Sequence, residues 1–476
     1  MQNCRHQLSR YWSIVAVVVL APLLLYATFF ILPTFDDWTT LTKPDFNPLF
    51  IKERFLFFGY HWRPFDSIIG YILGRDPMLL YPAFNHILVV VGHVICTFLI
   101  YHLTSTLGFS RLATNIVTFF FFIAPATMAT VLAVDSMNQT YALLWGMVAF
   151  FAYIKLKRAK YFRWIVLVFI ATLCKENGLM WALICPILAY GFDFINQKTL
   201  KKDLLIGIGI MIAYALIILV FPKDIIIHPE YEPGVTKVLK SIVKFLLTSF
   251  ITVDYIYLLH QPSRNLLLAA ISFLLAVPFT YYAFTKAFRS CMTKKIVCII
   301  LSLLIAVAPH VFTVFSMMHT YAGLPMVVLL IAYSIDSYGS KIKPIIISFL
   351  LFVITSLIID FHLWDESVKG GLLGKQMAQE AIRKTGKPVN NVYVVIIEDD
   401  YPKLSSFCVI PIDAFGWGLA TQYETNYQWP ITVKDTTIER SVSAASKVKE
   451  IAKDVLKSNS YDCVWIVDHK NIDVVK

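Results

Sequence analysis

Charged residues are scarce in this chain and unevenly placed. Of the 476 residues only 15% are Asp, Glu, Lys or Arg, whereas 58% are hydrophobic and the mean hydropathy is +0.66. A soluble domain carries about 25% charged residues. Apolar segments of about 17–25 residues, the length that spans a bilayer as a helix, fill the intervals between the charged stretches. The composition excludes an ordinary soluble protein and predicts a polytopic membrane protein.

The sequence also lacks internal repeats, low-complexity runs and cysteines at metal-ligand spacing. The eight cysteines are scattered, and those in apolar segments are most simply packing residues. Cys408 and Cys463 lie in the C-terminal region. If that region is outside the cell they can pair as a disulfide, and two free thiols are the equal alternative.

The net charge of +11 does not indicate nucleic-acid binding. From Phe361 to the end, 14 Lys and Arg residues stand against 15 Asp and Glu residues, so the surplus belongs to the preceding, apolar part. It concentrates in four short loops, at 155–163, 198–202, 286–295 and 341–343. Short basic loops face the cytoplasm. We therefore expect a cytoplasmic N-terminus, membrane lipids as neighbours and no nucleic-acid partner.

Placing the basic loops inside gives eleven crossings and an extracytoplasmic C-terminus. The predicted spans are 12–32, 84–105, 112–128, 139–154, 164–175, 178–193, 204–221, 264–285, 296–313, 321–338 and 344–361. Segment 236–260 is apolar enough for a helix but carries three lysines, and a crossing there would put the 286–295 loop outside. It is therefore predicted to be an interfacial or re-entrant helix on the outer face.

Two domains follow from this topology. Residues 1–361 form the transmembrane domain, with a first external loop at 33–82 that contains a surface helix around 50–73. Residues 362–476 form a small α/β extracytoplasmic domain. Its predicted elements are helices at 366–386 and 442–458 and strands at 391–397 and 461–467.

Asp36 and Asp37 are the first candidates for chemistry, because two adjacent carboxylates follow the first span directly. Near a low-dielectric boundary a carboxylate can serve as a general base. The pair can also hold a divalent cation such as Mg²⁺ or Mn²⁺ beside a phosphate. The plainer interpretation is a solvated loop with two ordinary acids.

Arg63, His86 and His93 are the next candidates. Arg63 stands among aromatic residues and suits a lipid phosphate, although an interfacial anchor is the favoured interpretation for it alone. His86 and His93 are seven residues apart and share a helix face within a span. Without a further ligand at metal spacing, a structural hydrogen-bonding role is favoured over a metal.

Further candidates lie in the later outer turns. Asp135 is the only acid of its turn and is also well suited to cap a helix. Lys175 and Glu176 form a charged pair between two apolar segments, where Lys175 can neutralise a phosphate and Glu176 can hold it in place. His319 and Tyr321 open the tenth span and offer donors to a phosphate or sugar, or anchor the helix at the interface.

All these residues fall on the outer side of the predicted topology. A transporter places its ionisable residues near the membrane midplane, on broken helices. The contrast favours chemistry at the outer interface.

The acidic pair, the following Arg-Pro at 63–64, the His-x6-His span and the Lys-Glu-x-Gly at 175–178 together resemble the GT-C superfamily of integral-membrane glycosyltransferases. The stretch 319–325 resembles a late motif of its protein O-mannosyltransferase-like (ArnT-like) branch. The resemblance covers roughly residues 12–360. Where a branch with TPR repeats has a His and a Glu after the proline that matches Pro125, this chain has Thr127 and Ala129. No TPR repeats follow, and the short α/β tail suggests a bacterial relative.

The resemblance implies a GT-C-like fold, a polyprenyl-phosphate-linked sugar donor and an inverting transfer to an acceptor hydroxyl. The base of the family matches Asp36 or Asp37, and its second acidic site matches Asp135. We therefore predict a glycosyltransferase of the bacterial inner membrane with a periplasmic active site, in which Arg63, Lys175, His319 and Tyr321 bind the donor phosphate. The sequence names neither the sugar nor the acceptor.

Two alternatives remain at this stage. A flippase or exporter of lipid-linked substrates would use alternating access and make no bond. An O-antigen-type ligase or polymerase would take a lipid-diphosphate glycan and rely on Arg and His in a late external loop.

Overall fold

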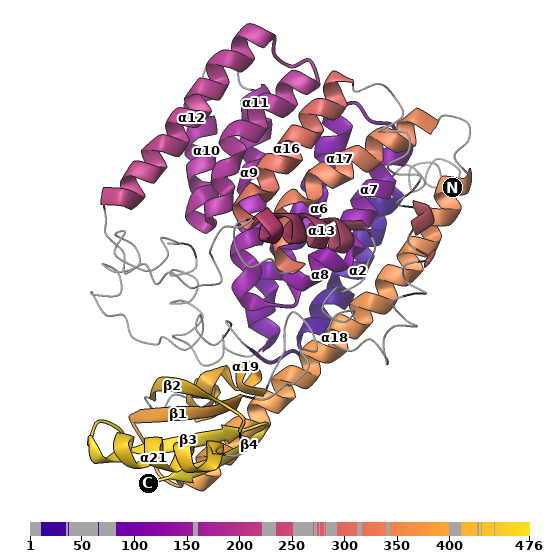
Figure 1. Ribbon diagram of the computed structural model, residues 1–476. Coiled ribbons are helices and arrows are strands. Elements are labelled where there is room, and N and C mark those ends of the chain that lie inside the picture. Colours follow the sequence, from indigo (N-terminus) through magenta and orange to yellow (C-terminus); the bar gives the residue numbers. More distant parts are fainter. Residues whose placement is uncertain are drawn as a thin grey trace.

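The computed structural model describes residues 11–34, 37, 65, 82–155, 160–220, 235–250, 270, 274–275, 277–279, 281, 293–311, 317–338, 343–398, 411–425, 428–429, 431–441 and 443–476. These residues form a bundle of helices followed by a small sheet domain. Figure 1 shows the sheet domain at the far end of one long helix, α18 (Lys343–Thr385).

The described helices of the bundle are α2 (Trp12–Thr28), α6 (Pro82–Thr106), α7 (Arg111–Ile123), α8 (Pro125–Val131), α9 (Met137–Lys155), α10 (Lys160–Cys174), α11 (Trp181–Gly191), α12 (Gln197–Val220), α13 (Val235–Phe250), α16 (Lys294–Val311) and α17 (Thr320–Tyr338). Short 3₁₀ turns precede three of them. They are η2 (Val134–Ser136) before α9, η3 (Glu176–Met180) before α11 and η5 (Met317–His319) before α17.

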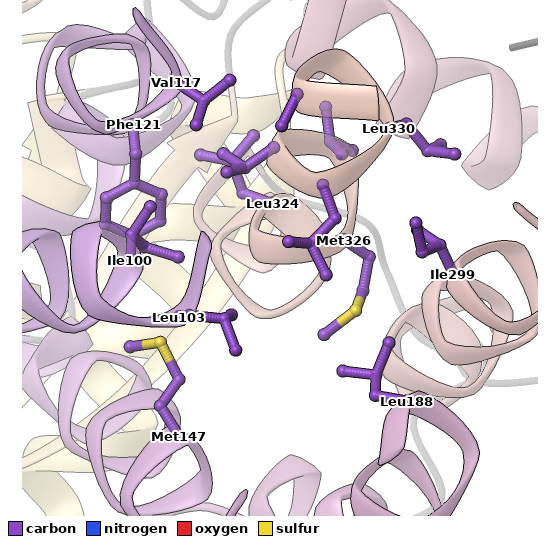
Figure 2. Close-up of a cluster of buried hydrophobic side chains, with 14 of the residues drawn as sticks. Ile100, Leu103, Val117, Phe121, Met147, Leu188, Ile299, Leu324, Met326 and Leu330 are labelled. Carbon is purple, nitrogen blue, oxygen red and sulfur yellow. The ribbon is translucent and has the colours of Figure 1, made fainter. Parts of the chain in front are cut away.

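Helix α17 forms the centre of the bundle. Figure 2 shows its side chains Leu324, Met326 and Leu330 surrounded by apolar side chains from α6, α7, α9, α11 and α16. Because lipid is as apolar as these side chains, close packing rather than exclusion of water holds such a bundle together. Gly146 of α9 illustrates the closeness, since a Cβ there would lie 2.1 Å from the indole nitrogen of Trp181.

Among the described residues, three helices are long and apolar enough to cross a membrane, or four if a bent pair counts as one span. They are 86–106, 317–338, the first part of α18 and the pair α7–α8. Trp12–Thr28 and Tyr161–Cys174 are shorter apolar helices. The predicted count of eleven crossings stays a prediction, and most of the expected span 264–285 lies outside the described residues.

The bend between α7 and α8 comes from Pro125. Proline lacks an N–H and is tolerated in the first helical turn, so α7 stops at Ile123 and α8 starts anew at an angle of 47°. The last carbonyls of α7 then lack partners within the helix. Nε2 of His93 donates to one of them, the carbonyl of Phe122, at 3.1 Å. The carbonyl of Ala124 starts α8 instead, since it accepts from the backbone N–H of Thr127 at 2.7 Å and also from the Thr127 hydroxyl.

Helix α13 runs across the bundle instead of along it. Figure 1 shows it crossing α16 and α17, which it contacts. The hydroxyls of Thr248 and Thr320 hydrogen-bond at 2.9 Å, which fixes α13 to the start of α17. This is the arrangement expected of the interfacial helix that the sequence predicts at 236–260, of which residues 251–260 lie outside the described part.

Helix α18 continues without a break from the bundle into the sheet domain. The helix predicted at 366–386 is confirmed as the second half of a longer helix, because Lys343–Thr385 is one helix of 43 residues. The predicted domain boundary at 361–362 falls within this helix and stays a prediction. Pro344 stands in the first turn, where proline is tolerated, and the glycines at 370, 371 and 374 do not interrupt the helix. Its small residues permit contact with the segment after α2, and a Cβ on Gly371 would lie 2.7 Å from the Cβ of Leu32.

The sheet domain has four strands in the order β2–β1–β3–β4: β1 (Asn391–Glu398), β2 (Thr432–Glu439), β3 (Cys463–Asp468) and β4 (Asn471–Val475). The first three are parallel and β4 is antiparallel to β3. Three short helices, α19 (Pro411–Phe415), η6 (Gly416–Gly418) and α20 (Ala420–Glu424), connect β1 to β2, and α21 (Ala444–Lys457) connects β2 to β3. The end of α18 packs on one face of the sheet and α21 on the other.

The predicted strands at 391–397 and 461–467 and the helix at 442–458 are confirmed to within two residues. Strands β2 and β4 were not predicted, because neither carries a continuous apolar run. Cys463 is buried and free, and burial raises the pKa of its thiol to about 11. Cys408 lies outside the described residues.

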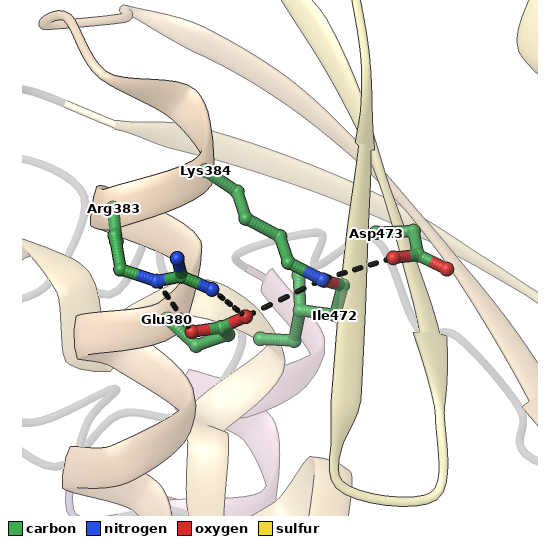
Figure 3. A network of polar contacts seen from close by, with 5 residues as sticks. All are labelled: Glu380, Arg383, Lys384, Ile472 and Asp473. Atoms are coloured by element: carbon green, nitrogen blue, oxygen red, sulfur yellow. Dashed lines mark hydrogen bonds and ion pairs between the residues drawn. The ribbon is translucent and has the colours of Figure 1, made fainter.

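A polar network fixes the end of α18 to β4 (Figure 3). Lys384 donates to the carbonyl of Ile472 at 2.7 Å and pairs with Asp473 at 3.0 Å and Glu380 at 3.3 Å. Arg383 pairs with Glu380 at 2.7 Å. Exposed ion pairs contribute about 0–1 kcal/mol each. The network therefore sets the orientation of the sheet domain on α18 more than it stabilises the fold.

We expect Gly371→Leu to destabilise the protein by about 1–3 kcal/mol, because the added side chain would overlap Leu32. The measurement is thermal unfolding in detergent. Gly209→Leu is the matched control, since a Cβ there meets nothing within 4 Å. Equal melting temperatures for the two variants would show that α18 is not in close contact with the segment after α2.

We also expect a pH-dependent contribution from Asp462. The backbone N–H groups of Asn391 and Asn390 donate to its carboxylate and lower the pKa of Asp462. The resulting stabilisation is present above the ordinary aspartate pKa of about 3.9 and is lost as the pH falls through the lower folded-state value.

Asp462→Ala should therefore cost about 1 kcal/mol at pH 7 and progressively less below pH ~4. Amide exchange of β1 and β3 in the full-length protein measures the loss. Asp435→Ala, an exposed acid on β2, is the control. A loss of protection that does not change with pH would contradict this account.

Candidate active site

Three helix breaks meet at one end of the bundle. The turns η2, η3 and η5 each precede a helix, and contacts between their neighbouring residues bring the starts of α9, α11 and α17 together. A helix start carries unpaired N–H groups and a partial positive charge. The three starts together favour a negatively charged ligand at this end of the bundle.

Lys175 brings positive charge to this end of the bundle. Its side chain is buried, with 9% of the residue exposed, and its ammonium group lies 3.4 Å from the amide oxygen of Asn138 at the start of α9. Close packing holds it there, because a Cβ on Gly178 would lie 2.3 Å from the backbone of Ala171 in α10. A lysine at such a site is expensive unless negative charge accompanies it.

Asn177, His310 and His319 continue the cluster. The amide of Asn177 donates to Nε2 of His310 at 3.3 Å. The imidazole rings of His310 and His319 stack with centroids 4.5 Å apart. These contacts tie η3, the end of α16 and η5 into one polar surface of amides and imidazoles next to Lys175.

Two buried amides in this region lack hydrogen-bond partners in the described part of the chain. Both polar atoms of the Gln139 side chain, 1% exposed, and Oδ1 of Asn177 are unsatisfied. Asn177 lines a cavity of about 10 Å³, bounded also by Ala142 and Leu143, which follow Gln139 one turn later on the same helix face. Buried polar groups normally have a partner, so these amides indicate a place for polar ligand groups or water.

A buried acid at the opposite end of the bundle, Asp203, has hydrogen-bond partners within the protein. Asp203 accepts a hydrogen bond from the hydroxyl of Tyr161 at 3.0 Å and another from Tyr153. It is therefore satisfied within the protein and acts as a structural residue. The unsatisfied amides of Gln139 and Asn177 distinguish the cluster around Lys175 from this site.

His86 and His93 tie α6 to the broken helix α7–α8. His86 donates through Nε2 to the carbonyl of Leu132 at 3.3 Å, and His93 donates through Nε2 to the carbonyl of Phe122 at 3.1 Å. Because a carbonyl only accepts, Nδ1 of His93 accepts from the hydroxyl of Tyr321 at 3.0 Å. This geometry suits the structural role predicted for both histidines. It also places Tyr321 in the interior, next to the site and bonded to His93.

The acidic candidates are only partly described. Asp37 is buried, and its carboxylate accepts from the backbone N–H of Thr34 at 3.2 Å. Ile31, six residues earlier, belongs to the same buried cluster as Met137 and Met317. Asp36 and Arg63 lie outside the described residues, as does the side chain of Asp135, whose backbone forms η2.

The described residues contain no group of three or more His, Cys, Asp or Glu side chains able to hold a metal ion. They therefore give no ligand set for the cation expected at Asp36 and Asp37. Glu176 stands at the start of η3, half-buried beside Lys175.

Sequence reasoning missed four residues of the cluster: Asn138, Gln139, Asn177 and His310. The first two form, with Thr140, a triplet that locally matches only a glycosylation acceptor. His310 and Asn177 carry no local signal, because a single amide or imidazole at the end of an apolar segment is common. Only their meeting in space identifies them.

Comparisons with known proteins give little further guidance. No protein-family model and no curated protein matches the chain. Among solved structures it is similar to the archaeal oligosaccharyltransferase AglB from Archaeoglobus fulgidus, in complex with an inhibitory peptide and a dolichol-phosphate. The identity is 13%, the match covers 96% of this chain and 70% of that chain, and the TM-score is 0.47. We draw no conclusion from a likeness at this score.

We expect Tyr321→Phe to cost about 1–3 kcal/mol of stability, since it leaves Nδ1 of His93 buried without a donor. Thermal unfolding in detergent measures the loss. Tyr26→Phe, at an exposed position, is the matched control and should melt as the unaltered protein does. An unchanged melting temperature for Tyr321→Phe would show that the hydrogen bond between Tyr321 and His93 does not stabilise the protein.

Proposed function

We propose that this protein transfers a sugar from a polyprenyl-phosphate-linked donor to an acceptor hydroxyl at the outer face of the bacterial inner membrane. The observation that carries the proposal is the cluster of Lys175, three helix starts and two unsatisfied buried amides at one end of a membrane bundle. The flippase alternative makes no bond and is separated from this proposal by the test below.

The cluster suits a lipid-linked sugar phosphate in three respects. Lys175 and the helix starts offer positive charge to the phosphate. The amides of Gln139 and Asn177 offer both donors and acceptors, as sugar hydroxyls require. The membrane beside the bundle accommodates the apolar chain of the donor, so that the phosphate is held at the interface.

In the proposed reaction, Asp36 or Asp37 takes the proton of the acceptor hydroxyl. The hydroxyl oxygen then forms a bond to the anomeric carbon as the bond from that carbon to the phosphate oxygen breaks. The lipid phosphate leaves with the bonding electrons, and Lys175, Arg63 and His319 stabilise its charge. Inversion at the anomeric carbon follows from a single displacement.

The remaining predicted residues have supporting roles in this proposal. Glu176 and Asp135 orient the polar groups at the starts of α11 and α9. His86, His93 and Tyr321 hold the broken helices in place. No step is assigned to a metal ion, because the described residues provide no ligand set for one.

We expect the purified protein in detergent to release sugar from at least one member of a panel of polyprenyl-phosphate sugars. The double variant Asp36→Asn, Asp37→Asn should lose about 10²–10⁴-fold in rate, because it lacks the general base. Lys175→Gln should lower the rate as well, because the leaving phosphate then lacks its buried cation.

Asp435→Asn and Lys201→Gln are the matched controls, since both residues are exposed and distant from the cluster. Full activity of the double aspartate variant would overturn the assigned chemistry. Movement of lipid-linked substrate between leaflets without turnover of any donor would favour the flippase instead.

A further inference from the structure

The helix α13 lies beside the candidate active site and is not used in the proposed chemistry. Its hydrogen bond from Thr248 to Thr320 places it next to His319, and the ring of Phe245 packs so closely on α17 that a Cβ on Gly323 would lie 2.9 Å from it. The helix is therefore anchored at η5, across the bundle (Figure 1).

Three faces follow the helical period of α13. Ser241, Phe245, Thr248 and Ser249 are buried against the bundle. Val235, Leu239 and Val243 form an exposed apolar stripe, with 79%, 58% and 52% of each residue exposed. Lys237, Lys240 and Lys244 form a lysine stripe. At 100° per residue the three faces stand roughly 120° apart around the helix axis.

This division fits a helix at the surface of a bilayer. One face packs on protein, the apolar stripe enters the acyl chains, and the lysines face the level of the lipid phosphates. Lys244 lies one turn, about 6 Å, from Thr248, so the lysine stripe ends next to the cluster around His319.

The lysine stripe carries concentrated positive charge. Lys240 and Lys244 are four residues apart and repel each other, a pairing that destabilises a helix. Burial, and then the neighbouring Lys240, lower the pKa of Lys244. An anion beside Lys240 would offset this repulsion.

We propose that α13 is the docking site for the phosphate of the polyprenyl-linked donor, bound by Lys240 and Lys244 while the first isoprene units lie along Val235, Leu239 and Val243. The proposal rests on the proposed function for the identity of the lipid. It adds a substrate-recruiting surface outside the reaction centre, through which the donor reaches Lys175 along the membrane plane.

The test measures binding of a polyprenyl monophosphate without sugar to the full-length protein in nanodiscs of zwitterionic lipid. Each lysine near a lipid phosphate contributes about fivefold in affinity, so Lys240→Gln, Lys244→Gln should weaken binding roughly thirtyfold. Lys240→Arg, Lys244→Arg retains the charge and should bind nearly as well. Lys198→Gln, Lys201→Gln, an exposed pair on α12, is the matched control.

Unchanged binding by the glutamine pair on α13, or an equal loss with the control pair, would overturn the docking site. Competition by excess phosphatidylglycerol at equal affinity would also overturn it, since α13 would then hold any anionic lipid. The assay needs no turnover, so it separates the two proposals. Lysine-dependent binding by the inactive Asp36→Asn, Asp37→Asn variant would support the dock even if no donor is ever turned over.

Discussion

Satisfaction of backbone polar groups in an apolar surrounding is the constraint on which this structure depends. Lipid offers no hydrogen bonds, so a helix break within the bundle is tolerated only where side chains supply the missing partners. The break at Pro125 exposes carbonyls of α7, and His93 satisfies that of Phe122. The hydrogen bond of His93 to Tyr321 then connects this break to the start of α17.

The same breaks create the candidate active site. Each of η2, η3 and η5 begins a new helix, and each beginning leaves N–H groups and positive partial charge at the same end of the bundle. Lys175 adds a full charge, and Asn138, Asn177 and His310 join the turns. A bundle of unbroken helices would not bring unpaired backbone N–H groups together beside the unsatisfied amide of Gln139.

Two elements that do not belong to this cluster determine what surrounds it. Helix α13 lies across the bundle beside η5 and carries the lysine stripe. Helix α18 passes the end of α2, where the indole N–H of Trp364 donates to the carbonyl of Ala27 at 2.8 Å, and continues into the sheet domain. The sheet domain is therefore joined to the bundle by one continuous helix that also contacts the segment after α2.

The sequence by itself determined the membrane class, the helix in the segment with Lys237, Lys240 and Lys244, and the α/β nature of the tail. These features follow from local composition and periodicity, which need no knowledge of distant contacts. It also singled out Lys175, His319 and Tyr321, because polar residues stand out against apolar segments. It missed β2 and β4, whose apolar residues do not form continuous runs.

Only the tertiary structure decided which polar residues meet. Asn138 lies 37 residues from Lys175, and Asn177 lies 133 residues from His310, and no local pattern relates such positions. Likewise, the apolar run ends near residue 361, but only the structure shows that the helical backbone continues to Thr385, because its hydrogen bonds are local and do not depend on side-chain polarity. Local side-chain polarity thus determined the class of each segment, and packing between segments determined which polar residues come together in the candidate site.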